Sequence, residues 1–311
     1  MDATPTDEPL VVWRLLDGKA GHENQVLGLA EALERCTLCH HIDVDASRAL
    51  KGFRAWLPGR TKFLDEVPAP HLLLGAGHST HLPLLSLKRQ FGGRTVMLMK
   101  PTLPMGWFDV CYIPSFHNLR PRPNLMLTEG TLNRIQPSNE LQDHRGLVLL
   151  GGPSSHFRWS DQTVLDQLAA VCLREPGTQW TITTSRRTPA SFVHSWRMSG
   201  LPGDLFPFHQ TSGVWLADQM RISGRVWVTC ESISMIFQSL TAGAAVGLLE
   251  LPVRKESRIT QCIRQLDTSG FVTLCTRWQS DRILRRTGRR LAEADRCAAD
   301  ILRRFPLITP R

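Results

Sequence analysis

Serine and acidic side chains follow an apolar run in the last third of this chain, where they could bind an anion. Residues 226–229 (VWVT) form the run, Ser232 and Ser234 come next at a helical spacing that Gly243 ends, and residues 245–249 form a second run. A strand, a helix and a parallel strand would bring the first strand's end beside free helix N–H groups. We predict a ligand site here; in the simpler alternative both serines only cap the helix.

Two glycine-rich turns in the first half suit a close approach of backbone to a ligand. Residues 17–22 (DGKAGH) and 76–80 (AGHST) each follow an apolar run and precede a helical pattern. His22 is our candidate general base for a hydroxyl group, with a solvated loop histidine as the alternative. The substrate-binding residues predicted beside it are Gly18, Gly21, Gly77 and His78.

Two further loops in the second half offer small residues and cations. Residues 151–155 (GGPSS) and 185–189 (SRRTP) each follow an apolar run. Arg186 and Arg187 could clamp a diphosphate through paired guanidinium hydrogen bonds, although solvated surface arginines are the alternative. The substrate-binding residues predicted in this half are Gly151, Gly152, Ser154, Ser155, Arg186, Arg187, Thr229, Glu231, Ser232, Ser234, Met235 and Gln238.

The cysteines and histidines do not predict a metal or haem site. Residues 36–40 (CTLCH) match the pattern for covalent haem attachment, but the chain begins with an acidic, proline-containing stretch that lacks an export signal. Strand alternation would send His40 and His41 to opposite faces, so zinc ligands would not converge. We expect no metal and no cofactor.

Apolar runs alternate with helical patterns along the chain, which predicts two doubly wound α/β domains. The polar stretch 131–144 is the expected linker, so the domains should span residues 1–136 and 137–284, with a C-terminal helix over 285–311 packing back on the first. Strands are expected at residues 10–16, 38–44, 71–75, 94–99, 107–114, 146–150, 180–184, 205–209, 226–229, 245–249 and 271–274.

The composition narrows the range of partners. The 311 residues are 42% hydrophobic, which excludes a disordered chain, and carry a formal net charge of +9 that comes mostly from arginine. Single, scattered cysteines indicate a reducing compartment, and no apolar run is long enough for a membrane helix, so we expect a cytoplasmic protein. The arginine-rich C-terminal helix should pack on the domains, with peripheral contact to the inner face of a membrane as the alternative. No nucleic-acid motif accompanies the charge.

Four separated motifs give the chain a family resemblance. Residues 17–25 (DGKAGHENQ), 151–155 (GGPSS), 183–189 (TTSRRTP) and 228–235 (VTCESISM) occur in the order found in the plant mitochondrial-fission "elongated mitochondria" proteins and their bacterial relatives, which are described as glycosyltransferases. The resemblance implies a GT-B architecture, with two Rossmann-like domains facing across a cleft and a nucleotide-sugar donor on the C-terminal one. It also implies sugar transfer to an unknown acceptor hydroxyl.

This chain departs from the family pattern at two relevant positions. Glu231 stands where the family has Asp, and Gln238 stands where similar enzymes have an acidic residue that would hold the donor ribose. A scaffold or membrane-associated protein that has lost its chemistry is therefore the alternative to a glycosyltransferase. A nucleotide-sugar epimerase is less well supported, because the Gly-x-Gly-x-x-Gly cofactor fingerprint is absent.

Overall fold

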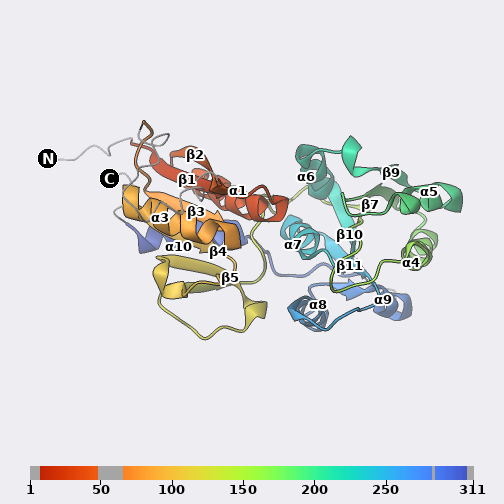
Figure 1. Ribbon diagram of the computed structural model, residues 1–311. Helices are drawn as coiled ribbons and strands as arrows, with labels where there is room; N and C mark the ends of the chain where they lie inside the picture. The colour runs from red at the N-terminus through yellow and green to blue at the C-terminus, as the bar shows by residue number, and fades with distance from the viewer. Residues whose placement is uncertain (1–7, 48–65, 282–283, 307–311) are drawn as a thin grey trace. The chain divides into compact units, whose positions relative to one another are not determined.

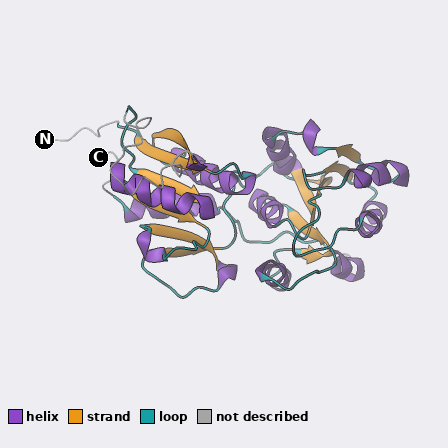
Figure 2. Cartoon of the chain, viewed as in Figure 1, coloured by secondary structure: helices purple, strands orange, loops and turns teal. Residues whose placement is uncertain are grey.

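A computed structural model describes residues 8–47, 66–281 and 284–306 of the chain, which divides into two compact units (Figure 1). The first unit contains the chain up to Arg134 and from Ala292 onward, and the second unit contains Ile135–Leu291. Each unit is a parallel β-sheet with helices packed around it (Figure 2). The structure confirms the predicted pair of doubly wound α/β domains.

The first unit is built on six parallel strands in the order β2-β1-β3-β4-β5-β6. Their residues are mostly apolar because helices cover both faces of the sheet. One face packs against α1 (Ala20–Glu34) and α10 (Glu293–Arg304), and the other against α3 (His81–Phe91). The strands are β1 (Leu10–Leu16), β2 (Cys39–Asp45), β3 (Leu72–Ala76), β4 (Arg94–Leu98), β5 (Val110–Pro114) and β6 (Leu125–Thr128).

The second unit repeats this design with the strand order β12-β11-β10-β7-β8-β9. Its strands are β7 (Gln142–Leu149), β8 (Gln179–Thr183), β9 (Asp204–Phe206), β10 (Ser223–Thr229), β11 (Ala245–Leu249) and β12 (Thr273–Leu274). Its helices are α4 (Asp161–Arg174), α5 (Ala190–Ser199), α6 (Gly213–Ile222), α7 (Ile233–Ala242), α8 (Arg258–Thr268) and α9 (Cys275–Asp281). Gly243 ends α7 with φ of 92°, as predicted.

The strand order reverses once in each sheet. In the first unit the chain moves outward from β1 to β2 and then crosses to β3, so the reversal lies between β1 and β3. In the second unit β8 and β9 extend one side and β10 begins the other, so the reversal lies between β7 and β10. Loops at such a point diverge to opposite sides of the sheet and leave room for a ligand at the carboxyl ends of the strands.

Several predicted boundaries were wrong. Helix α1 begins at Ala20 instead of residue 23, because the turn at Gly18 (φ of 77°) lets Lys19 accept the first helical hydrogen bonds. Residues Met105–Trp107 form a 3-10 turn, so the strand expected from residue 107 starts at Val110. Strand β6 was missed because it follows a proline-rich loop, and α9 was missed because it is short.

The C-terminal helix is shorter than predicted and packs within the first unit. It covers only Glu293–Arg304, so the arginines at 285, 286, 289 and 290 precede it, and residues 307–311 lie outside the described chain. Its Ala298 and Ile301 are fully buried in the core beside α1, and its buried Asp300 accepts a hydrogen bond of 3.0 Å from the Tyr112 hydroxyl. The apolar face that could meet lipid is thus used for packing. In the described chain no helix is long and apolar enough to cross a bilayer.

Candidate functional site

Three side chains meet where β1 and β3 end in the first unit. Asp17 follows β1, His22 lies in the first turn of α1, and Ser79 lies in the turn after β3. The Asp17 Oδ2 atom accepts a hydrogen bond of 2.6 Å from the Ser79 hydroxyl and lies 2.8 Å from His22 Nδ1. The strand reversal brings these groups together although Ser79 is 62 residues from Asp17.

The surroundings of Asp17 favour its charged form. Burial leaves 1% of its side chain exposed and by itself raises the pKa of the carboxyl, but hydrogen bonds from Ser79, His22 and the Lys19 amide outweigh it and hold that pKa below its usual value. The carboxylate accepts Nδ1–H of His22, which leaves Nε2 as the ring's proton acceptor. Since 30% of the His22 side chain is exposed, the arrangement suits a general base oriented by a carboxylate.

Glycine at position 77 makes room for this histidine. A Cβ atom there would lie 2.2 Å from two atoms of the His22 ring, and its φ of 85° favours glycine. Gly18 donates its N–H to Glu23 over 2.9 Å, which fixes the turn before α1, whereas nothing lies within 4 Å of a Cβ placed on Gly21. His78 stacks at a tilt on His81, 5.6 Å away, and makes no described contact with the Asp17–His22 pair.

In the second unit, three loops are tied together at Gly151 and Gly152, directly after β7. The last residue of β10 is Thr229, whose hydroxyl accepts the Gly151 N–H over 2.8 Å. The loop after β8 contributes Ser185 and Thr188, whose hydroxyls both donate to the Gly151 carbonyl. The carboxyl ends of the three neighbouring strands β7, β8 and β10 are thereby fixed to one another.

Glu231 completes this network with a buried carboxylate. Its Oε1 atom accepts the Gly152 N–H over 2.7 Å and lies 3.3 Å from Arg187 Nη2. None of its side chain is exposed, and Oε2 is buried without a hydrogen-bond partner in the described chain. Burial therefore raises the pKa of Glu231, against the opposing effects of the Gly152 amide, the Thr229 hydroxyl and Arg187.

The glycines at 151 and 152 are required by this packing. A Cβ atom on Gly151 would lie 1.7 Å from Glu231 Oε1, and one on Gly152 would lie 2.3 Å from the Arg187 carbonyl oxygen. The N–H groups of the predicted substrate-binding residues Gly151 and Gly152 are thus already used, by Thr229 and Glu231. Ser154 is also used locally, since its hydroxyl accepts the N–H groups of His156 and Phe157, whereas Ser155 is exposed.

The start of α7 is the open part of this edge. Ser232 is its N-cap residue and is buried, but its side chain makes no capping hydrogen bond. Ser234 is exposed, and Met235 and Gln238 are partly exposed. The first N–H groups of a helix have no intrahelical acceptor and attract anions, so this turn offers donors that the Gly151–Gly152 loop does not.

Sequence reasoning missed Asp17 and Ser79 as parts of the His22 cluster, and Thr188 as a tie between two loops. Asp17 and Ser79 were quoted within their turns, but only the strand order places the turns side by side. The clue was that each lies within three residues of a strand's carboxyl end, in a turn already selected.

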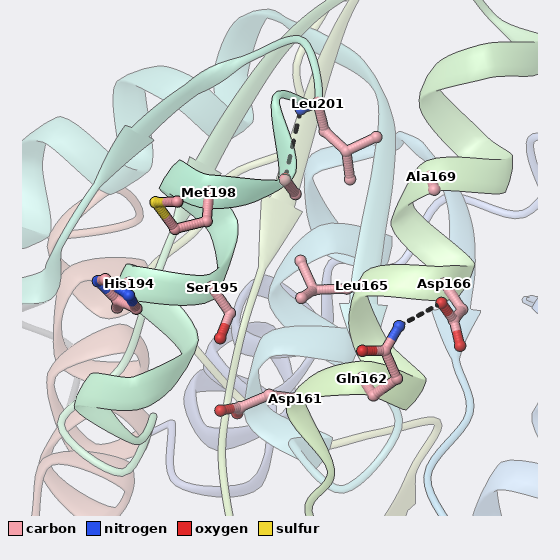
Figure 3. A pocket seen from close by; sticks show the side chains of 10 residues that line it. Asp161, Gln162, Leu165, Asp166, Ala169, His194, Ser195, Met198 and Leu201 are labelled. Atoms are coloured by element: carbon pink, nitrogen blue, oxygen red, sulfur yellow. Dashed lines mark hydrogen bonds between the residues drawn. The ribbon is translucent and has the colours of Figure 1, made fainter.

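Two other kinds of binding site, a metal centre and a surface groove, are less well supported in the described part of the chain. Among the residues that the structure describes, no three His, Cys, Asp or Glu side chains are grouped to hold a metal ion. A groove of about 480 Å³ lies between α4 and α5, with Asp161, Gln162 and Leu165 on one side and His194 and Met198 on the other (Figure 3). It contains none of the predicted site residues.

Solved structures that resemble this chain are nucleotide-sugar enzymes of the GT-B fold. A Listeria monocytogenes protein assigned as a UDP-N-acetylglucosamine 2-epimerase matches with a TM-score of 0.64 and 12% identity over 96% of this chain and 98% of that one. The UDP-N-acetylglucosamine 2-epimerase of Methanocaldococcus jannaschii, solved with UDP-GlcNAc and UDP, matches at 0.54 and 10% over 96% and 100%. MurG of Acinetobacter baumannii matches at 0.50 and 12% over 86% of each chain.

At these identities the structural matches establish the fold, and the family rests on the sequence. None of the curated proteins matches the chain. A family model described as mitochondrial fission ELM1 matches residues 20–305, which covers the Gly-rich turn at 76–80, the arginine pair and the whole second unit. This match confirms the resemblance drawn from the four motifs: the chain belongs to the mitochondrial fission ELM1 family.

Proposed function

We propose that this protein is a glycosyltransferase that moves a sugar from a nucleoside-diphosphate sugar to an acceptor hydroxyl. The observation that carries the proposal is that both predicted sites lie where the strand order of a parallel sheet reverses, which is where open α/β sheets bind ligands. Structural neighbours of the same fold were solved with UDP or UDP-sugars, which supports a nucleotide sugar as the ligand.

The donor would bind at the β7/β10 edge of the second unit. Its diphosphate would be stabilised by the first N–H groups of α7 and by the guanidinium group of Arg186 or Arg187, which follow β8. These groups would also stabilise the charge that develops on the leaving diphosphate, which is why we propose a metal-independent reaction. Gln238 lies one turn into α7 and would donate to or accept from a ribose hydroxyl, more weakly than a carboxylate.

His22 would act as the general base. In this proposal its Nε2 takes the proton of the acceptor hydroxyl while the acceptor oxygen forms a bond to the anomeric carbon and the bond from that carbon to the diphosphate oxygen breaks. The bonding electrons leave with the nucleoside diphosphate. Asp17 stabilises the imidazolium that forms, because it keeps its negative charge and already binds Nδ1.

Binding of a donor can be tested without knowing the acceptor. The purified protein is mixed with UDP-, GDP- and CMP-sugars, and the retained ligand is identified by mass spectrometry and measured by calorimetry. We expect one class to be retained and to raise Tm. The Gly77→Ala variant serves as a control, because it disturbs the His22 edge but not the second unit, and its affinity for the donor should match the wild type.

A catalytically inactive scaffold is the second candidate, because Glu231 already binds the Gly152 amide that a phosphate could use. In that case no nucleotide sugar would be retained or raise Tm. If a donor is retained, incubation without acceptor separates the reaction types, since an epimerase alone would convert the sugar of the donor.

A further inference from the structure

The adjacent residues Arg186 and Arg187 cannot be told apart by sequence, but the structure gives them different environments. Arg187 turns back toward its own unit: Nη2 lies 3.3 Å from Glu231 Oε1, and Nη1 donates to the Pro153 carbonyl over 3.4 Å. Arg186 is exposed and makes no hydrogen bond or ion pair with any residue that the structure describes. The two guanidinium groups therefore have different tasks available to them.

Glu231 needs a counterion. Its carboxylate is completely buried and receives the Gly152 amide on one oxygen, while the other oxygen has no partner in the described chain. A buried carboxylate without a nearby cation is costly, and losing the cation of such a pair is more damaging than losing both charges. Arg187 is the cation at this position, and 46% of its side chain is exposed, so water still solvates part of its charge.

The Glu231 carboxylate also holds the loop in shape. Its contact with the Gly152 N–H joins the β10 loop to the β7 loop, and the Gly152 backbone packs against the Arg187 backbone at a distance that excludes even a methyl group. Because Oε2 has almost no accessible surface, Glu231 is not placed to touch a ligand. It is therefore a positioning residue and not, as the sequence suggested, a substrate-binding one.

We propose that the two arginines divide the work at the β7/β10 edge: Arg187 is the counterion that keeps Glu231 bracing the Gly151–Gly152 loop, and Arg186 is the cation that contacts the diphosphate of the donor. The second half of this statement rests on the proposed function, whereas the first half does not. The two halves are therefore tested by different measurements.

The brace, which is the Arg187–Glu231 pair that holds the Gly151–Gly152 loop, is tested by thermal unfolding at pH 7. Arg187→Ala should lower Tm by about 5 °C, because it leaves Glu231 buried without its cation. Adding Glu231→Gln should restore most of the loss, since the amide oxygen still accepts the Gly152 N–H and no buried charge remains. Arg186→Ala, the matched control, should leave Tm unchanged. If the double variant is no more stable than Arg187→Ala, Glu231 and Arg187 are not coupled and the brace is overturned.

The ligand contact is tested by calorimetric titration with UDP, or with whichever nucleoside diphosphate the wild type retains. Arg186→Ala should raise Kd about tenfold or more and reduce the dependence of Kd on salt concentration, whereas the Glu231→Gln/Arg187→Ala double variant should change Kd less than threefold. The reverse order of effects would overturn the assignment. If the wild type binds no nucleoside diphosphate, the proposed function fails, and the unfolding measurements still decide whether the brace exists.

Discussion

Each unit carries a buried carboxylate at its strand reversal, and the pKa values of the two carboxyl groups are shifted in opposite directions. Asp17 receives Ser79, His22 and the Lys19 amide, and its pKa is lowered. Glu231 has one oxygen without a partner, and burial raises its pKa. Burial raises the pKa of both carboxyl groups and hydrogen bonds lower it; the hydrogen bonds prevail at Asp17, and burial prevails at Glu231. The first unit is thus suited to proton transfer and the second to holding loops in place.

The largest effect should come from the proton-transfer side. If His22 is the base, His22→Ala should reduce sugar transfer by about 10²- to 10⁴-fold, and Asp17→Asn should reduce it by a similar factor because the imidazolium loses its partner. Initial rates with the retained donor and its acceptor measure this. Donor affinity should be unchanged in both variants; a change in affinity without a change in rate would refute the assigned role.

The next largest effect should come from comparing alanine substitutions at two glycines, one in each unit. Gly151→Ala should lower the free energy of unfolding by about 3 kcal/mol, because its Cβ would overlap Glu231 Oε1 at 1.7 Å. Gly21→Ala should be neutral or stabilise the protein by about 0.5 kcal/mol, since nothing lies near its Cβ and alanine favours a helix. Urea unfolding of both variants is the measurement. Equal losses would contradict the view that Gly151 is tightly packed and Gly21 is not.

The opposite pKa shifts predict opposite effects of pH on stability. Asp17 has a lowered pKa, so its contribution is complete above pH 3.8 and is lost as pH falls below that value; Asp17→Asn should flatten this acid limb. Glu231 has a raised pKa, so its contribution is complete below pH 4.5 and is lost as pH rises. Glu231→Gln should therefore gain stability relative to the wild type above pH 4.5. Unfolding curves recorded from pH 3 to 7 measure both differences, which should have opposite signs. Parallel profiles for wild type and variants would contradict both shifts.

The smallest effect should come from Ser79, which donates a hydrogen bond to Asp17 and makes no hydrogen bond with His22 in the described structure. Ser79→Ala removes one of the donors to Asp17 and should reduce transfer only a few-fold, about 1 kcal/mol, because His22 and the Lys19 amide remain. The pH–rate profile should shift as well, which a purely structural role would not cause. Ser86→Ala, in α3 and away from Asp17, is the matched control.

The positions of the loops at the strand ends could be predicted from the sequence, but the contacts between those loops could not. Apolar runs followed by Gly-rich turns located β1, β3, β7 and β10 and hence the residues at their ends, because strand, turn and helix are local patterns. Strand order is not local, so the contact between Asp17 and Ser79 could not be predicted. Nor could the difference between Arg186 and Arg187, which depends on one being oriented toward a buried carboxylate 44 residues away. The length of α10 was overestimated because arginines at helical spacing continued before its start.

The path of the chain through the first unit affects how that unit folds during synthesis on the ribosome. That unit combines segments from before and after the second unit, and α10, with Ala298, Ile301 and Asp300, supplies part of its interior. The apolar surface of the earlier strands therefore stays partly uncovered until the whole second unit and α10 have been synthesised. The second unit is one uninterrupted segment and can finish folding sooner, so the half that is begun first is completed last.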